Sequence, residues 1–434
     1  MELRYVREKM LPQQEPPLGE KGAVKWLREN LFSGWLNTIL TVAGALALFF
    51  LIKASLPWFQ HGVWNAKSLS ECRAVIEVNW GPGQSGACWA LIHERWNQFI
   101  YGFYPADLYW RPNLTFMLLL AAIAPVLYGQ LPRQLLIVPL AFPALAFWLL
   151  WGGSIWGPVM AMVGFGLIYL GYRLLNDRLG AVVSMAIGFA VACVWWLWLQ
   201  SSVSTPLAAA LPFFSLTPVE SDRFGGFLLA FVIGVSAIVA SLPLGIILAL
   251  GRKSDMPLVK MLCVGFIEFV RGVPLITMLF TASLLLQYFL PRGTKFDLIL
   301  RVDILVTLFS AAYIAEVIRG GLAALPRGQS EAADALGLNY WQAQRQIIMP
   351  QALKISIPGI VSSFIGLFKD TTLVTFVGLM DPLKGITQVV RADINWKGIY
   401  WEPYLFVGAI FFVFCFGMSR YSMYLERKLK RDHR

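Results

Sequence analysis

The sequence predicts an all-α protein that crosses a membrane about ten times. Of its 434 residues, 57% are hydrophobic and only 14% are charged. The mean hydropathy is +0.62. Several apolar runs reach about 20 residues, which as helix cover the roughly 30 Å of a bilayer core.

Composition also excludes several classes of protein. In a membrane protein the net charge of +11 indicates basic cytoplasmic loops rather than nucleic-acid binding. Three histidines and no Cys-x-x-Cys pair give no metal site, and no catalytic constellation stands out. No Gly-Lys dipeptide occurs, so the phosphate-binding loop of an ATPase is absent. The polar start of the chain argues against a cleavable signal peptide.

The chain begins with a polar cytoplasmic arm at 1–34, in which a short interfacial helix is expected near Trp26. A first span follows at 35–57. The stretch 58–113 is polar and rich in tryptophan, and is expected to form a folded periplasmic excursion.

Two cysteines, Cys72 and Cys88, lie together in this excursion on the oxidising side of the membrane. We predict a disulfide between them, and two packed free thiols are the alternative. Cys193, Cys263 and Cys415 lie in or beside apolar runs and are expected to be inert packing residues.

The region 35–200 is predicted to be an accessory membrane region, and 201–224 a periplasmic linker. Beyond the first span, its apolar runs hold several prolines and almost no charge, which suits a scaffold. These runs are 114–131, 134–152, 155–173 and 180–200.

The second half, 225–424, is predicted to be the functional core, followed by a basic cytoplasmic tail at 425–434. Charges here lie at membrane depth, where each costs about 2.5–3.5 kcal/mol and should face protein or water. Gly272 and Pro274 should kink or break the second of its spans. The predicted spans are 225–250, 260–290, 301–322, 355–378 and 404–424.

Lysine and arginine counts set the topology. With the amino terminus inside, the cytoplasmic segments hold roughly twice as many basic residues as the opposite side. Both termini and the loop after span 301–322 are then cytoplasmic.

That loop is the only long polar, helix-forming segment between apolar runs. It should hold two short helices. Ser330 is expected to be the N-cap of the first helix, and Gly337 to end it. Asn339 and Gln342 are spaced for a capping box on the second, which Pro350 should interrupt.

The spacing within this loop is specific. Glu331-Ala332-Ala333, three residues, Gly337, nine residues, Ile347, two residues and Pro350 resemble the EAA loop of ABC importer permeases, with Met349 where that family has leucine. An ordinary amphipathic loop is the alternative. The resemblance implies a coupling loop at 326–350 that docks on a separate ATPase through Glu331, Ala332, Ala333 and Gly337.

Further stretches extend the resemblance from about Gly225 to the end. These are Glu268-Phe-Val-Arg-Gly-Val-Pro274, Tyr313-Ile-Ala-Glu-Val-Ile-Arg-Gly-Gly321 and Phe368-Lys-Asp-Thr-Thr-Leu373. They resemble type I ABC importer permeases of the polar amino-acid uptake family. The amino-terminal half, with Tyr109-Trp-Arg-Pro-Asn-Leu114, is similar to the larger permease of general L-amino-acid importers.

The resemblance implies partners as well as a fold. It implies an importer of amino acids in a bacterial inner membrane, with a second related permease as heterodimer, two ATPase copies and a periplasmic binding protein. ATP and magnesium would bind the ATPase, and this chain would need no cofactor of its own.

A zwitterionic substrate needs a donor for its carboxylate and an acceptor for its ammonium group. Five polar residues of the core supply these groups: Glu316, Lys369, Asp370, Thr371 and Thr372. The alternative is structural: these charged residues pair with one another, or Glu316 pairs with Arg319 one turn away. Arg319 and Lys369 would then snorkel from the cytoplasmic ends of their spans.

A second functional class is an ion-coupled secondary transporter for amino acids. Such folds often contain inverted repeats, and the two halves of this chain differ too much in charge and loop pattern to resemble repeats. A membrane enzyme is a distant third possibility.

Overall fold

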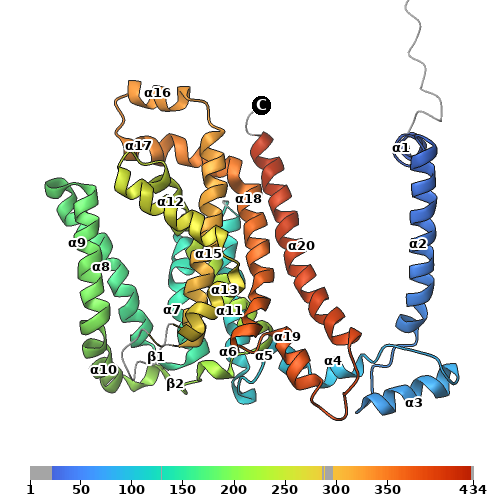
Figure 1. The fold of residues 1–434 in the computed structure, drawn as a ribbon. Coiled ribbons are helices and arrows are strands. Elements are labelled where there is room, and N and C mark those ends of the chain that lie inside the picture. Colours follow the sequence, from blue (N-terminus) through green and yellow to red (C-terminus); the bar gives the residue numbers. More distant parts are fainter. Residues whose placement is uncertain (1–21, 129, 286–287, 289–296, 432–434) are drawn as a thin grey trace, which may run out of the picture. The chain divides into compact units, whose positions relative to one another are not determined.

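The computed structural model describes residues 22–128, 130–285, 288 and 297–431. This part of the chain is almost entirely helical (Figure 1). Its two strands, β1 (Gly153–Ser154) and β2 (Ser215–Leu216), form one short antiparallel pair. The chain divides into two compact units, 1–93 and 94–434.

The first unit contains the interfacial helix and the first span. Helix α1 (Gly22–Asn30) carries Trp26, which confirms the short helix predicted there, and the rest of the arm lies outside the described residues. Helix α2 (Trp35–Gln60) is the predicted first span. The excursion then forms α3 (Leu69–Trp80) and the short α4 (Ala90–Glu94).

The second unit opens with the remaining accessory helices. The α9 run continues without a break through a π-helical segment into α10, so residues 201–210 of the predicted linker are helical although they contain Pro206. Membrane helices tolerate proline in this way. The elements are α5 (Trp96–Tyr101), η2 (Ala106–Leu108), α6 (Trp110–Leu127), η3 (Arg133–Leu136), α7 (Ile137–Trp151), α8 (Trp156–Leu179), α9 (Ala181–Val194), η4 (Trp195–Leu199), α10 (Gln200–Ala210), η5 (Pro212–Phe214) and η6 (Ser221–Arg223).

The core follows from residue 226. Its second span breaks where predicted, because α12 ends at Gly272 and α13 starts after Pro274. The elements are α11 (Gly226–Arg252), α12 (Pro257–Gly272), α13 (Leu275–Phe280), η7 (Thr281–Leu285), α15 (Leu298–Ala323), α16 (Gly328–Ala335), α17 (Tyr340–Ala343), η8 (Gln344–Ile348), α18 (Met349–Asp370), η9 (Thr371–Val377), α19 (Pro382–Lys384), η10 (Gly385–Val390) and α20 (Trp401–Arg431).

Within the described residues, nine helical runs are long and apolar enough to cross a membrane. They match nine of the ten predicted spans. The tenth, 260–290, is the broken α12–α13 segment, whose last residues lie largely outside the described part of the chain. The multi-pass all-α fold predicted from composition is therefore confirmed.

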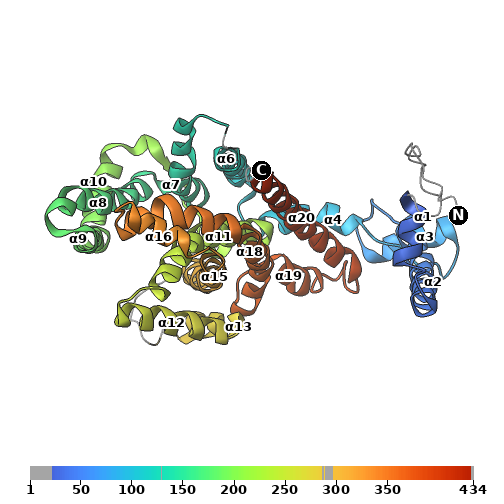
Figure 2. The ribbon, with the colours of Figure 1, turned by 90° about the horizontal axis from the view of Figure 1, so that it is seen from above.

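Small residues let the central core helices α11, α15 and α18 pack closely (Figure 2). A Cβ added at Gly245 of α11 would lie 2.6 Å from Ile314 Cγ2 of α15. A Cβ at Gly321 of α15 would lie 2.6 Å from the Ala352 carbonyl oxygen of α18. Close backbone approach of this kind stabilises helix pairs where lipid removes the hydrophobic driving force.

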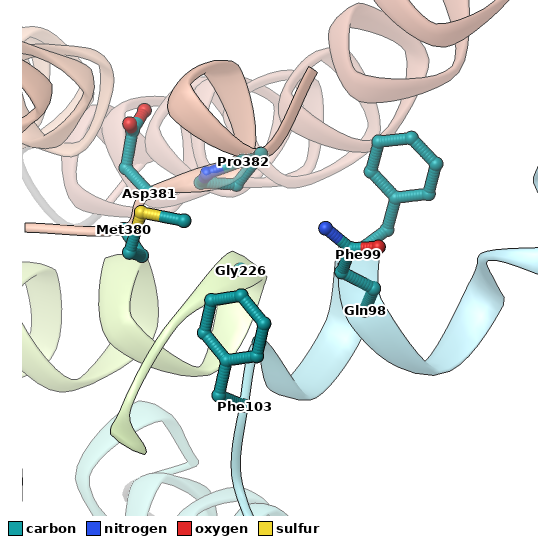
Figure 3. Close-up of a pocket in the computed structure, with 9 residues that line it drawn as sticks. Gln98, Phe99, Phe103, Gly226, Met380, Asp381 and Pro382 are labelled. Carbon is teal, nitrogen blue, oxygen red and sulfur yellow. The ribbon is translucent and has the colours of Figure 1, made fainter. Parts of the chain in front are cut away.

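Two segments of the second unit contact Gly226 at the start of α11 (Figure 3). They are α5, which carries Phe99, and the residues just before α19, which include Met380. Gly226 has φ +58°, and a Cβ there would lie 2.2 Å from the Phe99 carbonyl oxygen. Its N–H donates to the Met380 carbonyl at 2.8 Å. The cavity beside them measures about 10 Å³, which is about the room that one water needs. This junction is therefore a packing contact, too small for an amino acid.

Buried polar contacts join parts of the accessory region to each other and to the linker that precedes the core. Arg111, on α6, is 2% exposed and donates to the Thr217 carbonyl at 2.7 Å. The Tyr104 hydroxyl donates to the Leu150 carbonyl at 2.8 Å. The two contacts join segments 106 and 46 residues apart in the sequence, all within the second unit.

Candidate functional site

The polar loop between α15 and α18 forms two short helices at one end of the core bundle (Figure 1). Helix α16 begins at Gly328, with Arg327 in the N-cap position and no side-chain cap. The predicted N-cap Ser330 is therefore wrong: it lies inside the first turn, because the turn after Pro326 already closes through the Ser330 N–H to the Arg327 carbonyl at 3.0 Å.

Gly337 ends α16, as predicted. It has φ +70°, a left-handed conformation that favours glycine. The Gly337 N–H donates to the Asp334 carbonyl at 2.9 Å, and the Leu338 N–H to the Ala333 carbonyl at 3.2 Å. Nothing lies within 4 Å of an added Cβ, so the backbone conformation alone selects glycine here.

The capping box on α17 is confirmed. Asn339 Oδ1 accepts from the Gln342 N–H at 2.9 Å, and Gln342 Oε1 accepts from the Asn339 N–H at 3.0 Å. The expected interruption at Pro350 is wrong. The π-helical segment η8 carries the helix from α17 into α18 without a break, and Pro350 is the second residue of α18.

The loop divides its side chains between two faces. Ala333 is completely buried, and packs with Leu322, Ala343 and Ala352 against the core. The opposite face exposes polar and small residues together with the large apolar Leu336, which is 74% exposed. Reasoning from the EAA pattern did not single out Leu336. The exposed residues from Ser330 to Leu336 are Ser330, Glu331, Ala332, Asp334, Ala335 and Leu336.

Glu316 lies in a cluster of ionic side chains from three core helices. Arg319, on the same helix, forms an ion pair with it. Arg252 Nη1 of α11 lies 3.4 Å from Glu316 Oε2, and Arg271 Nη1 of α12 lies 3.7 Å from the same oxygen. Glu268 of α12 adds a second carboxylate, 2.8 Å from Arg252.

Lys369 and Asp370 lie at the other end of the core. Lys369 is next to last in α18, about 30 Å of helix from Met349 at the coupling end, whereas Glu316 is about 10 Å from the coupling end of α15. The interpretation that Lys369 snorkels from the cytoplasmic end is therefore wrong, because α18 carries the chain away from the coupling loop. The structure does not bring Glu316 and Lys369 together.

The hydroxyls of the two threonines that follow Asp370 donate to backbone carbonyls three residues earlier in the chain. The Thr371 hydroxyl donates to the Phe368 carbonyl at 2.8 Å, and Thr371 is completely buried. The Thr372 hydroxyl donates to the Lys369 carbonyl at 2.8 Å. Both hydroxyls therefore have only acceptor capacity left for a ligand.

Two charged residues near the start of α15, the half-buried Asp303 and the buried Arg301, were not singled out from the sequence. Asp303 Oδ1 accepts a hydrogen bond from the Ser236 hydroxyl of α11 at 2.7 Å. Arg301 is 6% exposed and donates to the Ser283 carbonyl of η7 at 2.7 Å. The rule that charges at membrane depth need partners applies equally to these two residues, so the signal was present in the sequence.

In the first unit the structure joins Cys72 and Cys88 by a disulfide. Their Cα atoms are 6.1 Å apart, and both side chains are buried. Cys193, Cys263 and Cys415 are free and partly buried. No group of three or more metal-ligating side chains occurs in the part of the chain that is described.

Comparisons with known proteins give the family. Residues 241–431 match the family described as binding-protein-dependent transport system inner membrane component. The glutamate/glutamine/aspartate/asparagine transport system permease protein BztC of Rhodobacter capsulatus is 68% identical, over 99% of both chains. The inner membrane amino-acid ABC transporter permease protein YhdY of Escherichia coli is 39% identical, over 94% of this chain and 93% of its own.

Among solved structures, one described as an amino acid ABC transporter with histidines is 29% identical. It covers 46% of this chain and 91% of its own, with a TM-score of 0.41. The family rests on the two relatives that match over nearly their whole length. The chain belongs to the inner membrane components of binding-protein-dependent transport systems, the permease subunits of ABC transporters.

Proposed function

We propose that this chain is one permease subunit of an ATP-driven importer for amino acids. The observation that carries the proposal is the coupling loop 326–350. It is fixed to the core through buried Ala333 and presents Glu331, Ala332 and Leu336 outward. A rigid, exposed helix of this kind can pass movement of a docked ATPase to the spans on either side of it.

The remaining subunits belong to the same proposal. An ATPase in two copies would bind ATP and magnesium, a second related permease would complete the membrane pathway, and a binding protein would deliver substrate on the side opposite the coupling loop. The family description names binding-protein-dependent transport. The membrane is the bacterial inner membrane, with both termini cytoplasmic.

The substrate class that we propose is acidic amino acids and their amides. Its support is the relative at 68% identity, whose name includes glutamate, glutamine, aspartate and asparagine. Lys369 and Asp370 are our candidates for the substrate pathway, because both lie near the end of α18 where substrate would enter, with Thr371 and Thr372 beside them. The ionic partners of Glu316 favour a structural role for that residue.

Uptake into proteoliposomes tests the function. The complex is reconstituted with purified binding protein outside, and entry of labelled glutamate is measured with ATP inside, with a non-hydrolysable analogue inside, or with an imposed proton or sodium gradient. Uptake that requires both hydrolysable ATP and binding protein supports the importer. Uptake driven by an ion gradient without ATP would instead indicate a secondary transporter.

Unlabelled competitors then test the substrate class. Excess aspartate, glutamine and asparagine should each reduce uptake of labelled glutamate, whereas excess lysine or leucine should not. Equal competition by lysine would show a broader specificity than the one proposed.

A further inference from the structure

A polar cavity of about 190 Å³ lies at the base of the coupling loop. It is formed where the end of α15, the start of α16, the turn after α11 and the end of η8 come together. For comparison, an apolar protein cavity of about 150 Å³ admits a benzene molecule. The residues that matter for its chemistry are Lys253, Arg327, Gln329, Ser330, Leu325 and Ile348.

The polar side chains of the cavity are mainly hydrogen-bond donors. Lys253 and Arg327 bring two positive charges, and no carboxylate is among the residues that line it. Gln329 Oε1 accepts from Gln351 Nε2 at 3.0 Å, which leaves the NH₂ group of the Gln329 amide free to donate. Ser330 adds a hydroxyl. An anion with several acceptor oxygens, such as a carboxylate, complements this set.

The position of the cavity indicates where the carboxylate comes from. The cavity includes the first residues of α16, whose exposed Glu331, Ala332 and Leu336 form the proposed ATPase contact. A side chain of an ATPase docked on α16 is therefore close enough to enter the cavity. Lys253 and Arg327 are both exposed, so they are accessible to a partner from the aqueous side.

We propose that this cavity receives an acidic side chain of the ATPase subunit, which pairs with Lys253 and Arg327 when the coupling loop docks. The assignment rests on the proposed function and adds to it the chemistry of one contact. It also links the ATPase directly to α11, through Lys253, as well as to the loop between α15 and α18. Movement of the ATPase would then reach three spans of the core.

The test is the affinity of the purified ATPase for the permease complex in nanodiscs. The double variant Lys253→Glu/Arg327→Glu should raise the dissociation constant by about tenfold or more, as reversal of close interfacial charge pairs does. The dissociation constant of Arg327→Lys should stay near that of the wild type. The dissociation constant of Arg327→Gln should lie between those of the wild type and the double variant. Lys260→Glu is the matched control, because Lys260 is an exposed cation of α12 outside the cavity.

Salt gives a second readout. The wild-type affinity should fall as ionic strength rises, and the double variant should lose part of that dependence. Thermal unfolding of each variant complex without ATPase checks that the core is intact. If the wild type binds the ATPase and the double variant binds equally well, the cavity assignment is wrong and the proposed function stands. If the wild type does not bind the ATPase, both are wrong.

A further experiment tests whether the cavity binds a small anion instead of an ATPase side chain. Free glutamate at millimolar concentration is added while ATP hydrolysis is followed in the assembled complex without binding protein. A rate change that the double variant abolishes, with its ATPase affinity unchanged, would overturn the assignment in favour of a small-molecule site.

Discussion

Arg252 and Glu316 join two core helices near the coupling end, with Nη1 of Arg252 3.4 Å from Oε2 of Glu316. Glu316 also has Arg271 and Arg319 as ionic partners, so one carboxylate connects α11, α12 and α15. A shared carboxylate of this kind holds helix ends together. Its removal leaves Arg252 paired with Glu268 and takes away the ion-pair partner that Arg271 and Arg319 share.

The first prediction follows from this cluster. Glu316→Gln should lower the thermal stability and the assembly of the complex, because it removes the negative charge that the three arginines share. The order of preferred amino acids should stay unchanged. Thermal unfolding and uptake competition measure the two effects, with Glu77→Gln on the exposed surface of α3 as the control for loss of one glutamate. A changed order of preferred amino acids would instead indicate that Glu316 contacts the substrate.

The second prediction concerns the turn at Gly337. A β-branched residue is strained at φ +70°, at a cost of about 1–2 kcal/mol. Gly337→Val should therefore distort the α16–α17 turn while the spans still insert. We expect loss of transport and of binding-protein-stimulated ATP hydrolysis, with the protein still present in the membrane fraction.

Gly328→Ala is the matched control for that experiment. Gly328 is in the same loop, has no positive φ, and has open space where a Cβ would go. Transport and binding-protein-stimulated ATP hydrolysis by Gly328→Ala should be close to those of the wild type. Normal stimulated hydrolysis in Gly337→Val would show that the turn does not transmit coupling.

Local features of the coupling loop could be predicted from the sequence, and features that depend on packing could not. Gly337 and the Asn339 capping box depend on neighbouring residues only, and both are confirmed. The errors at Ser330 and Pro350 arose because the turn after Pro326 already starts α16 at Gly328, and because the π-helical η8 joins α17 to α18. The pairing of Glu316 with Arg252 joins residues 64 positions apart, which no local pattern indicates.

The third prediction is that Cys72 and Cys88 are disulfide-bonded in the purified protein. A bridge that closes a loop of about 15 residues stabilises a fold by about 3 kcal/mol in the loop-entropy model. Mass spectrometry of unreduced peptides should find the two linked, whereas Cys193, Cys263 and Cys415 react with an alkylating agent after denaturation. Five alkylated cysteines without prior reduction would rule the bridge out.

The fourth prediction concerns pH and Asp381, which lies outside the spans and is 1% exposed. Burial raises the pKa of this carboxyl above its ordinary value, although backbone N–H groups of Lys384 and Leu383 donate to it and oppose the shift. The folded protein therefore holds this proton more tightly than the unfolded chain. The contribution to stability is present at low pH and is lost as pH rises through the raised pKa.

Asp381→Asn isolates that contribution. In the wild type the two N–H bonds that cap α19 go to separate carboxylate oxygens, at 3.1 and 3.0 Å. Asparagine has one acceptor oxygen and keeps one of them, so the comparison uses the slope of stability against pH and not its absolute value. Thermal stability measured between about pH 4 and pH 7 should fall with pH more steeply in the wild type than in the variant. Parallel curves would show that Asp381 does not titrate differently in the folded state.

The last prediction concerns substrate recognition at the end of α18. Asp370 and Lys369 bring opposite charges to the side where substrate would enter, and the neighbouring threonine hydroxyls already donate to backbone carbonyls. A carboxylate in the pathway would attract the ammonium group of every amino acid and repel an acidic side chain. Asp370→Asn should therefore weaken uptake of neutral amino acids more than uptake of glutamate. Lys369→Gln should have the opposite effect. Initial uptake rates over a range of concentrations give the apparent constants, and the Glu316→Gln complex serves as the structural comparison. If both variants keep the wild-type order among acidic, neutral and basic amino acids, these residues do not form the pocket.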